Sequence, residues 1–432
     1  MIQQTAEVRN ATTVPWVLSG RSEAGLRAQA ARLLTHAEGA TAPDVHAVGR
    51  SLVRTGVAFE HRAVVLGRDV GELVAGARAV AEGSPAPNVV SGRVDGTRPG
   101  VVFVFPGQGT QWAGMAVGLL ADAPVFAASV DACAEALAPH LDWSLHDVLR
   151  GAPDAPPLDR VDVVQPVLFT VMVSLAELWR SFGVTPAAVV GHSQGEIAAA
   201  KVAGALSLED AARLVALRSQ ALTAIRGRGD MVTVLARRDR VLELLEPFGD
   251  RLAVAAVNGP ATVTVSGDVE AMSEFNAVLR AGKLLRWRVP GVDFAAHSPH
   301  VADLREALLE LAAGITPRAS EVPFYSTVTG APTPTTDLDA GYWYRNLRQT
   351  VRYDEATRAL LADGHAVFLE CSAQPVLTVG MQDTAEEAGR SAAFLATLRN
   401  GDGGLGRFLT AAAEVHVTGA GVDWSAVFPT TR

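Results

Sequence analysis

Short apolar runs alternate with amphipathic stretches along the middle of the chain, and this alternation predicts an α/β fold with a parallel sheet. The runs at 101–105 and 187–191 are almost wholly apolar, as expected of strands buried on both faces of a sheet. A similar run at 367–370 is a further candidate strand. The predicted helices of this part are 166–182, 196–203 and one that begins with the capping-box pattern Ser207-Leu-Glu-Asp210.

Residues 230–295 interrupt this alternation with the order strand, helix, strand, strand, helix, strand. That order is the split-βαβ arrangement of ferredoxin-like folds. The predicted strands are 231–236, 252–257, 262–266 and 284–289, and the predicted helices are 238–248 and 270–280. We therefore expect a ferredoxin-like subdomain inserted into a larger domain made of residues 98–229 and 296–395.

Residues 1–97 have a pattern of their own, which predicts a small N-terminal α/β unit. Helical patterns at 22–36 and 69–81 flank a candidate strand at 61–67. The stretch 89–100 is polar and punctuated by Gly and Pro, which is typical of a linker between domains.

The composition is that of a globular protein, with 49% hydrophobic and 19% charged residues among 432. The net charge of −9 argues against a nucleic-acid partner, because no broad basic surface displaces counterions from phosphates. Two cysteines, Cys133 and Cys371, and no Cys/His cluster predict neither a disulfide framework nor a metal site. Residues 1–14 lack a signal-peptide pattern and no uninterrupted apolar run has transmembrane length, so we expect a cytoplasmic protein without a membrane partner.

The segment Gly191-His-Ser-Gln-Gly195 fits the G-x-S-x-G pattern, with a predicted strand before it and a predicted helix after it. The glycines permit a tight turn that exposes the Ser193 hydroxyl, and the helix N-terminus directs N–H groups at charge developing on a bound carbonyl. The pattern predicts that Ser193 is the nucleophile of an acyl-transferring enzyme. An ordinary glycine-rich turn is the alternative.

A serine nucleophile needs a base, and the histidines that follow it are His297, His300, His365 and His416. His297 lies where the chain leaves the predicted insert and returns to the large domain, and such a position can line a cleft between two units. His297 is therefore the favoured base, against the alternative of a hydrogen-bonded structural histidine.

Two further segments hold candidate ligand-binding groups. Gly107-Gln-Gly-Thr-Gln-Trp112 follows a predicted strand, where Gln108 or its backbone N–H can donate to a substrate carbonyl; a plain turn fits this segment equally well. Arg218 lies in an otherwise apolar helical stretch, where a buried guanidinium needs an anion. A substrate carboxylate, bound by a bidentate clamp, meets that need. The alternatives are a structural salt bridge and an arginine that faces solvent.

Together these segments resemble the acyltransferase domain of modular type I polyketide synthases, a relative of malonyl-CoA:acyl-carrier-protein transacylases. The matching segments are Gly107-Gln-Gly-Thr-Gln-Trp112, Arg160-Val-Asp-Val-Val-Gln165, Gly191-His-Ser-Gln-Gly-Glu196, Leu217-Arg-Ser-Gln220, Asn258-Gly-Pro260 and Phe294-Ala-Ala-His297. The resemblance covers essentially the whole chain. It implies an α/β-hydrolase-like large domain with a ferredoxin-like insert, a linker to a ketosynthase in residues 1–97, and a post-acyltransferase linker in 396–432.

The resemblance also implies roles for the site residues. Ser193 becomes the acyl ester, and His297 is its base and later the acid for the leaving thiol. Gln108 and the backbone N–H of Gln194 form the oxyanion hole. In this family a backbone carbonyl near the Asn-Gly-Pro loop orients the histidine, so Asn258 is the candidate for that orientation.

Arg218, by the same resemblance, pairs with the free carboxylate of a malonyl-type unit. The acyl group comes from acyl-CoA and passes to the phosphopantetheine thiol of an acyl carrier protein. The ketosynthase domain of the same synthase is a further partner, and no cofactor is bound permanently.

Selectivity is where the sequence departs from the family's patterns. Gln165 and Gln194 resemble members that select a C2-substituted extender unit, usually methylmalonyl. Such members carry Tyr-Ala-Ser-His before the base and malonyl-selective ones carry His-Ala-Phe-His, whereas this chain has Phe294-Ala-Ala-His297. We expect methylmalonyl first and a bulkier alkylmalonyl second. The candidate selectivity residues are Gln165, His192, Phe294, Ala295 and Ala296.

Two other functions fit part of the sequence. A serine esterase or thioesterase shares the G-x-S-x-G turn, but it favours an acidic residue and then a histidine near the end of the sheet and gives no reason for Arg218. A non-catalytic scaffold segment of a synthase is the other alternative, and the Ser193 and His297 pair argues against it.

Overall fold

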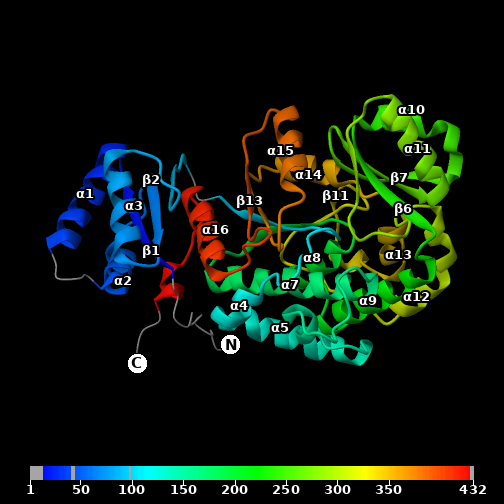
Figure 1. Ribbon diagram of the computed structural model, residues 1–432, viewed down its shortest axis with the longest axis horizontal. Helices are drawn as coiled ribbons and strands as arrows, with labels where there is room; N and C mark the ends of the chain where they lie inside the picture. Colours follow the sequence, from blue (N-terminus) through cyan, green and yellow to red (C-terminus); the bar gives the residue numbers. More distant parts are fainter. Residues whose placement is uncertain (1–12, 40–43, 97–98, 429–432) are drawn as a thin grey trace.

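The computed structural model describes residues 13–39, 44–96 and 99–428. These residues form three sheets, which follow one another along the long axis of the molecule in Figure 1. The three-stranded N-terminal sheet lies at one end, the six-stranded sheet in the middle and the four-stranded sheet at the other end. Most of the segment 1–14, where the sequence predicts no signal peptide, lies outside the described residues.

The N-terminal unit is an antiparallel sheet in the order β1-β2-β3, against which three helices pack. Its elements are β1 (Val14–Gly20), α1 (Glu23–Gly39), α2 (Val45–Thr55), β2 (His61–Gly67), α3 (Val70–Glu82) and β3 (Val89–Arg93). The prediction of a linker at 89–100 is wrong over its first five residues, because Val89 pairs with Val65 and extends the sheet. No residue of β3 is fully buried, so the strand carries little hydrophobic signal. Residues 97–98 of that stretch lie outside the described residues.

The central sheet has the order β11-β10-β5-β4-β12-β13 and is parallel except for β11, which pairs antiparallel with β10 at one edge. Its strands are β4 (Val101–Phe105), β5 (Pro186–Gly191), β10 (Phe324–Ser326), β11 (Ala331–Pro332), β12 (Val367–Glu370) and β13 (Ala393–Ala396). The helices of this part are α4 (Val117–Asp122), α5 (Pro124–Leu137), α6 (Leu145–Arg150), α7 (Val161–Ser181), α8 (Gly195–Ala203), α9 (Leu208–Leu222), α12 (Arg305–Ala312), α13 (Ala340–Arg348), α14 (Tyr353–Ala362) and α15 (Thr378–Glu387). The predicted α/β fold with a mostly parallel sheet is confirmed.

The C-terminal part of the chain joins the N-terminal sheet to the central one. Helix α16 (Leu405–Val417) contacts β2 and β3 as well as β13. Arg62 of β2 donates to the backbone carbonyl of His416 at 2.8 Å. An added Cβ at Gly92 of β3 would lie 2.9 Å from Cβ of Val417, so glycine is what permits this close approach. The boundary expected between residues 395 and 396 falls inside β13.

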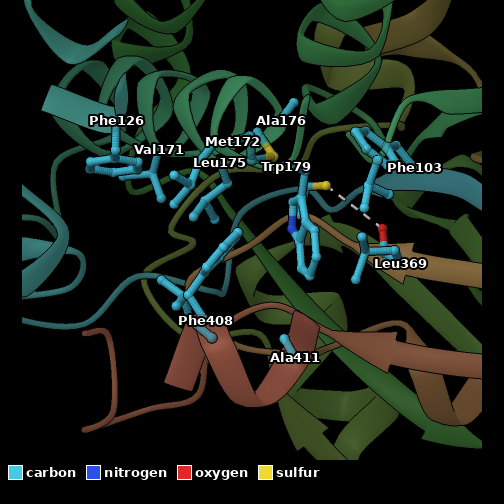
Figure 2. Close-up of a cluster of buried hydrophobic side chains, with 14 of the residues drawn as sticks. Phe103, Phe126, Val171, Met172, Leu175, Ala176, Trp179, Leu369, Phe408 and Ala411 are labelled. Atoms are coloured by element: carbon cyan, nitrogen blue, oxygen red, sulfur yellow. Dashed lines mark hydrogen bonds between the residues drawn. The ribbon is translucent and has the colours of Figure 1, made fainter. Parts of the chain in front are cut away.

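Helix α7 is the central packing element of the large domain. It has the length and apolar composition of a membrane span, but 89% of its most apolar window is buried inside the protein. Its Trp179 ring lies 4.5 Å from that of Phe408 in α16, and Figure 2 shows it between α16 and the sheet residues Phe103 and Leu369. The helix begins five residues before the predicted start at Pro166, which lies inside it rather than in its first turn.

The four-stranded sheet belongs to the inserted subdomain. Its elements are β6 (Gly229–Leu235), α10 (Arg238–Leu245), β7 (Leu252–Gly259), β8 (Thr262–Asp268), α11 (Val269–Ala281) and β9 (Arg286–Arg288). The strands are antiparallel in the order β7-β8-β6-β9, so the ferredoxin-like βαββαβ prediction is confirmed. Helices α10 and α11 pack on one face through an apolar cluster that contains Val234, Val263 and Phe275. Ala256 of β7 forms an isolated parallel bridge with Val351, which ties the subdomain to the large domain.

Candidate active site

The turn between β5 and α8 carries Ser193 with a φ of +54°, in the left-handed region that few non-glycine residues adopt. An added Cβ at Gly195 would lie 2.1 Å from the carbonyl oxygen of Phe105, and one at Gly191 would lie 2.3 Å from the backbone nitrogen of Glu196. Both glycines are therefore required for the tight strand-to-helix turn. The sequence pattern predicts this turn correctly.

Ser193 and His297 form a hydrogen-bonded pair, with 2.8 Å between Oγ and Nε2. His297 Nδ1 lies 2.9 Å from the backbone carbonyl of Gln349. Because a carbonyl only accepts, Nδ1 carries the ring proton and Nε2 is left to accept from the serine. Burial, and after it the charge of Arg218, lowers the pKa of His297 to about 3, so the ring is neutral near pH 7. A neutral imidazole held in this tautomer is suited to act as a general base.

Asn258 does not orient His297, which corrects the expectation from the sequence. Its Oδ1 lies 2.9 Å from Nε2 of His192 and accepts from that ring. The carbonyl that orients His297 is that of Gln349, 52 residues further along the chain. A backbone carbonyl leaves no side-chain signature in a sequence, so no motif pointed to this position.

A cavity of about 540 Å³ opens between the large domain and the inserted subdomain. The predicted site residues that line it are Gln108, Gln165, His192, Ser193, Gln194, Arg218, Asn258, Phe294, Ala296 and His297. Ala295 is fully buried outside this lining, and its carbonyl accepts from the Ser298 hydroxyl. Ala295, named as a candidate selectivity residue, is therefore not among the residues that line the cavity, whereas Phe294 and Ala296 are.

The other three candidate histidines are not part of the cavity lining. His300 lies 2.6 Å from Asp268 through Nε2, and Nδ1 of His416 accepts from the Trp424 indole at 3.3 Å. Both are hydrogen-bonded structural histidines. Within residues 13–39, 44–96 and 99–428 no group of three His, Cys, Asp or Glu side chains is placed to hold a metal ion.

Arg218 is a buried cation in the cavity wall, with 1% of its surface exposed. It donates to Oε1 of Gln165 at 3.2 Å and to Oδ1 of Asn346 at 3.3 Å, and its Nε has no partner. Among the described residues no carboxylate forms an ion pair with it. Burial lowers its pKa to about 10, against a smaller opposing effect of the charge on Glu196. A guanidinium with neutral acceptors and an unused donor is suited to bind an anion that enters the cavity.

The two glutamines expected at the oxyanion hole differ in their surroundings. Gln108 donates through Nε2 to the carbonyl of Gly291 at 2.7 Å, which uses one of the two hydrogens on that nitrogen. Its second Nε2 hydrogen and its backbone N–H are the candidate oxyanion donors. Gln194 is the residue before α8, where helix N–H groups point toward the cavity end of the turn. Its side chain is fully buried, and neither Nε2 nor Oε1 has a partner.

The family comparison agrees with this geometry. The model of the acyl transferase domain matches residues 102–422. The chain belongs to the acyl transferase domain family. The nucleophile turn therefore serves an acyltransferase rather than an esterase.

Known relatives of this acyltransferase are polyketide synthases. Polyketide synthase GfsA of Streptomyces halstedii is 57% identical over 418 residues, which cover 96% of this chain and 6% of that protein. The acyltransferase domain from module 8 of the salinomycin polyketide synthase has a TM-score of 0.93 and 51% identity, with 97% of this chain and 99% of that one covered. The acyltransferase domain of SpnD, in complex with 2-(pent-4-yn-1-yl)malonyl, has a TM-score of 0.84 and 28% identity, with coverages of 98% and 100%. The chain thus spans a small part of the length of the curated synthase that it matches.

Two side chains that hold this acyltransferase site together are not predicted from the sequence. Glu196 is fully buried and accepts from the backbone and hydroxyl of Thr327 and from the Tyr342 hydroxyl. Asn346 donates to the same carboxylate and to the carbonyl of Ser193. The charged residue in the first turn of an otherwise apolar helix was the available signal for Glu196. Asn346 carries no such signal, because its partners lie more than a hundred residues away.

Proposed function

We propose that this acyltransferase takes a C2-substituted malonyl unit from acyl-CoA, holds it as an ester of Ser193, and delivers it to the phosphopantetheine thiol of an acyl carrier protein. Methylmalonyl is the first candidate, and a bulkier alkylmalonyl is the second. One observation carries the proposal. The hydrogen-bonded Ser193–His297 pair lines the same cavity as Arg218, a buried arginine that forms no ion pair with a described carboxylate.

In the first half-reaction Ser193 Oγ attacks the thioester carbonyl while its proton passes to His297 Nε2. Backbone N–H groups of Gln194 and Gln108 stabilise the oxyanion. The carbon–sulfur bond then breaks, and the departing CoA thiolate takes the proton from His297. The protonated His297 ring thus acts as the general acid for the leaving thiol.

The second half-reaction runs the same steps with the carrier thiol in place of CoA. His297 takes the proton of the incoming thiol, a new carbon–sulfur bond forms, and the Ser193 ester bond breaks as Oγ recovers its proton. No step of this scheme draws on a permanently bound cofactor. The polyketide synthase relatives support a carrier protein and a ketosynthase domain of the same synthase as partners, and a cytoplasmic place of action.

The cavity wall supports a C2 substituent on the acyl unit. Phe294 and Ala296 both line the cavity, and Ala296 offers a methyl group where a serine would add a hydroxyl. A single methylene in an apolar pocket is worth about 1–3 kcal/mol, so small changes here decide between substituents. The pentynylmalonyl ligand of the SpnD domain supports the bulkier alternative.

The test is intact-mass measurement after exposure to a competing mixture of malonyl-, methylmalonyl-, ethylmalonyl- and propionyl-CoA. We expect an adduct that carries a C2-substituted malonyl group, and none in the Ser193→Ala variant. Equal acylation by plain malonyl-CoA refutes the proposed selectivity. An adduct that water removes as fast as a carrier protein does refutes transfer in favour of thioester hydrolysis.

A further inference from the structure

Asn346 of α13 lies between a buried cation and a buried anion. Its Nδ2 donates to Glu196 Oε2 at 2.7 Å and to the Ser193 carbonyl at 3.1 Å, while its Oδ1 accepts from Arg218 Nη2 at 3.3 Å. Asn346, Glu196 and Arg218 are 2%, 0% and 1% exposed. Since both hydrogens on Nδ2 have acceptors, the amide is oriented with its oxygen toward the arginine.

The hydrogen-bond partners of Glu196 and Arg218 show that the Asn346 amide separates two opposite charges. The Glu196 carboxylate is held by neutral donors alone: the Thr327 backbone and hydroxyl, the Tyr342 hydroxyl and the Asn346 amide. Arg218 is held by two neutral amide oxygens. Opposite charges in a buried site gain most from direct contact, yet here one side-chain amide keeps them apart.

We propose that Asn346 is a positioning residue that prevents Arg218 from pairing with Glu196 and thereby keeps the guanidinium available for the carboxylate of the acyl unit. The inference rests on the proposed function, in which Arg218 binds that carboxylate. Glu196 remains near enough to favour the charged form of Arg218 without occupying its donors. The charge of Glu196 therefore stabilises the Arg218 cation without a direct ion pair, because the neutral Asn346 amide lies between them.

A shortened side chain at position 346 tests this directly. In Asn346→Ala the barrier between the two charges is gone, and Arg218 can turn onto Glu196. We expect the preference of Ser193 acylation for methylmalonyl-CoA over propionyl-CoA, measured as a ratio of single-turnover rates by intact mass, to fall at least about tenfold, the value of one charge-assisted hydrogen bond.

The double variant Asn346→Ala/Glu196→Gln separates this role from a merely structural one. Removing the negative charge leaves Arg218 without an internal partner, so the preference recovers even though two buried residues have been changed. A packing role predicts the opposite, because a second change in the same buried cluster then adds to the damage. The overall rate falls in both variants through the lost contact to the Ser193 carbonyl, so the ratio is the quantity that decides.

Asn276→Ala is the matched control. Asn276 is also a helical asparagine whose Oδ1 accepts from an arginine, Arg286 Nε at 3.2 Å, and whose Nδ2 donates to a backbone carbonyl, but that arginine, unlike Arg218, does not line the cavity. We expect its ratio to equal that of the unaltered chain. Asn346→Ser makes the same test where Asn346→Ala does not fold, with the same expected loss.

Three results overturn the proposal. An unchanged ratio in Asn346→Ala, or a lowered ratio that Glu196→Gln fails to raise, refutes the role of Asn346 and leaves the proposed function standing. Absence of any preference for methylmalonyl-CoA in the unaltered chain refutes the proposed function, and the inference falls with it.

Discussion

Replacing Arg218 with methionine removes the guanidinium and keeps a side chain of similar length in α9. A hydrogen bond to a charged group contributes about 1.5–3 kcal/mol, which corresponds to roughly 10- to 150-fold in rate. We expect Arg218→Met to lose that factor in kcat/KM for methylmalonyl-CoA, while kcat/KM for propionyl-CoA, which has no free carboxylate, changes little. Steady-state transfer to a carrier protein measures both constants.

The same substitution has a second, independent readout through His297. In the unaltered chain burial and then the positive charge of Arg218 lower the pKa of His297, and the neutral ring is the base in the proposed mechanism. Without the arginine that pKa rises, although burial still holds it below the ordinary value. The acidic limb of kcat/KM for propionyl-CoA therefore moves to higher pH in Arg218→Met.

Arg213→Met is the control, since Arg213 lies on the same helix outside the cavity lining. It should alter neither the substrate preference nor the pH profile. If Arg218→Met keeps the preference for methylmalonyl-CoA and the acidic limb stays in place, Arg218 neither binds the carboxylate nor acts electrostatically on His297, and the reasoning is wrong.

Three further predictions concern the pocket, the turn and the partner. Ala296→Ser narrows the cavity that Ala296 lines, so the ratio of alkylmalonyl- to methylmalonyl-CoA turnover should fall by about tenfold in competition assays. An unchanged ratio contradicts a role for Ala296 in substrate selectivity. Gly195→Ala places a Cβ 2.1 Å from the Phe105 carbonyl oxygen, so it should abolish acyl-Ser193 formation and lower Tm. Gly404→Ala is the control, because its added Cβ meets nothing within 4 Å, and it should leave acylation and Tm unchanged. Transfer to an acidic carrier protein should slow as salt screens exposed arginines on the surface of this chain, and a salt-independent rate counts against such steering.

Local patterns predicted the parts of the site that depend on neighbouring residues. The turn at Ser193 needs glycines at fixed offsets, a buried strand before it and a helix after it. The residues that determine all three lie within about a dozen neighbouring positions of the sequence. Arg218 was recognisable because a charge in an apolar helix is costly to bury. The order of strands and helices in residues 230–295 sufficed for the ferredoxin-like subdomain.

Features that depend on distant contacts or on the backbone were not predictable in this way. The carbonyl of Gln349 has no side-chain identity, so the orientation of His297 was placed on Asn258 instead. Strand β3 gains its stability from pairing with β2 rather than from burial, and its polar composition was taken for a linker. Ala295 lies between two residues that line the cavity but does not line it itself, and the sequence does not distinguish the three positions.

The end of α13 explains how both members of the hydrogen-bonded pair Ser193 and His297 keep an unfavourable backbone conformation. Ser193 and His297 have φ values of +54° and +57°, and a left-handed residue costs about 1–2 kcal/mol. The Asn346 amide donates to the Ser193 carbonyl, the Leu347 carbonyl accepts from the His297 N–H at 2.9 Å, and the Gln349 carbonyl accepts from its ring. Three residues within positions 346–349, which carry no recognisable motif, therefore fix Ser193 and His297 together, because strain of this kind persists only where surrounding contacts determine it.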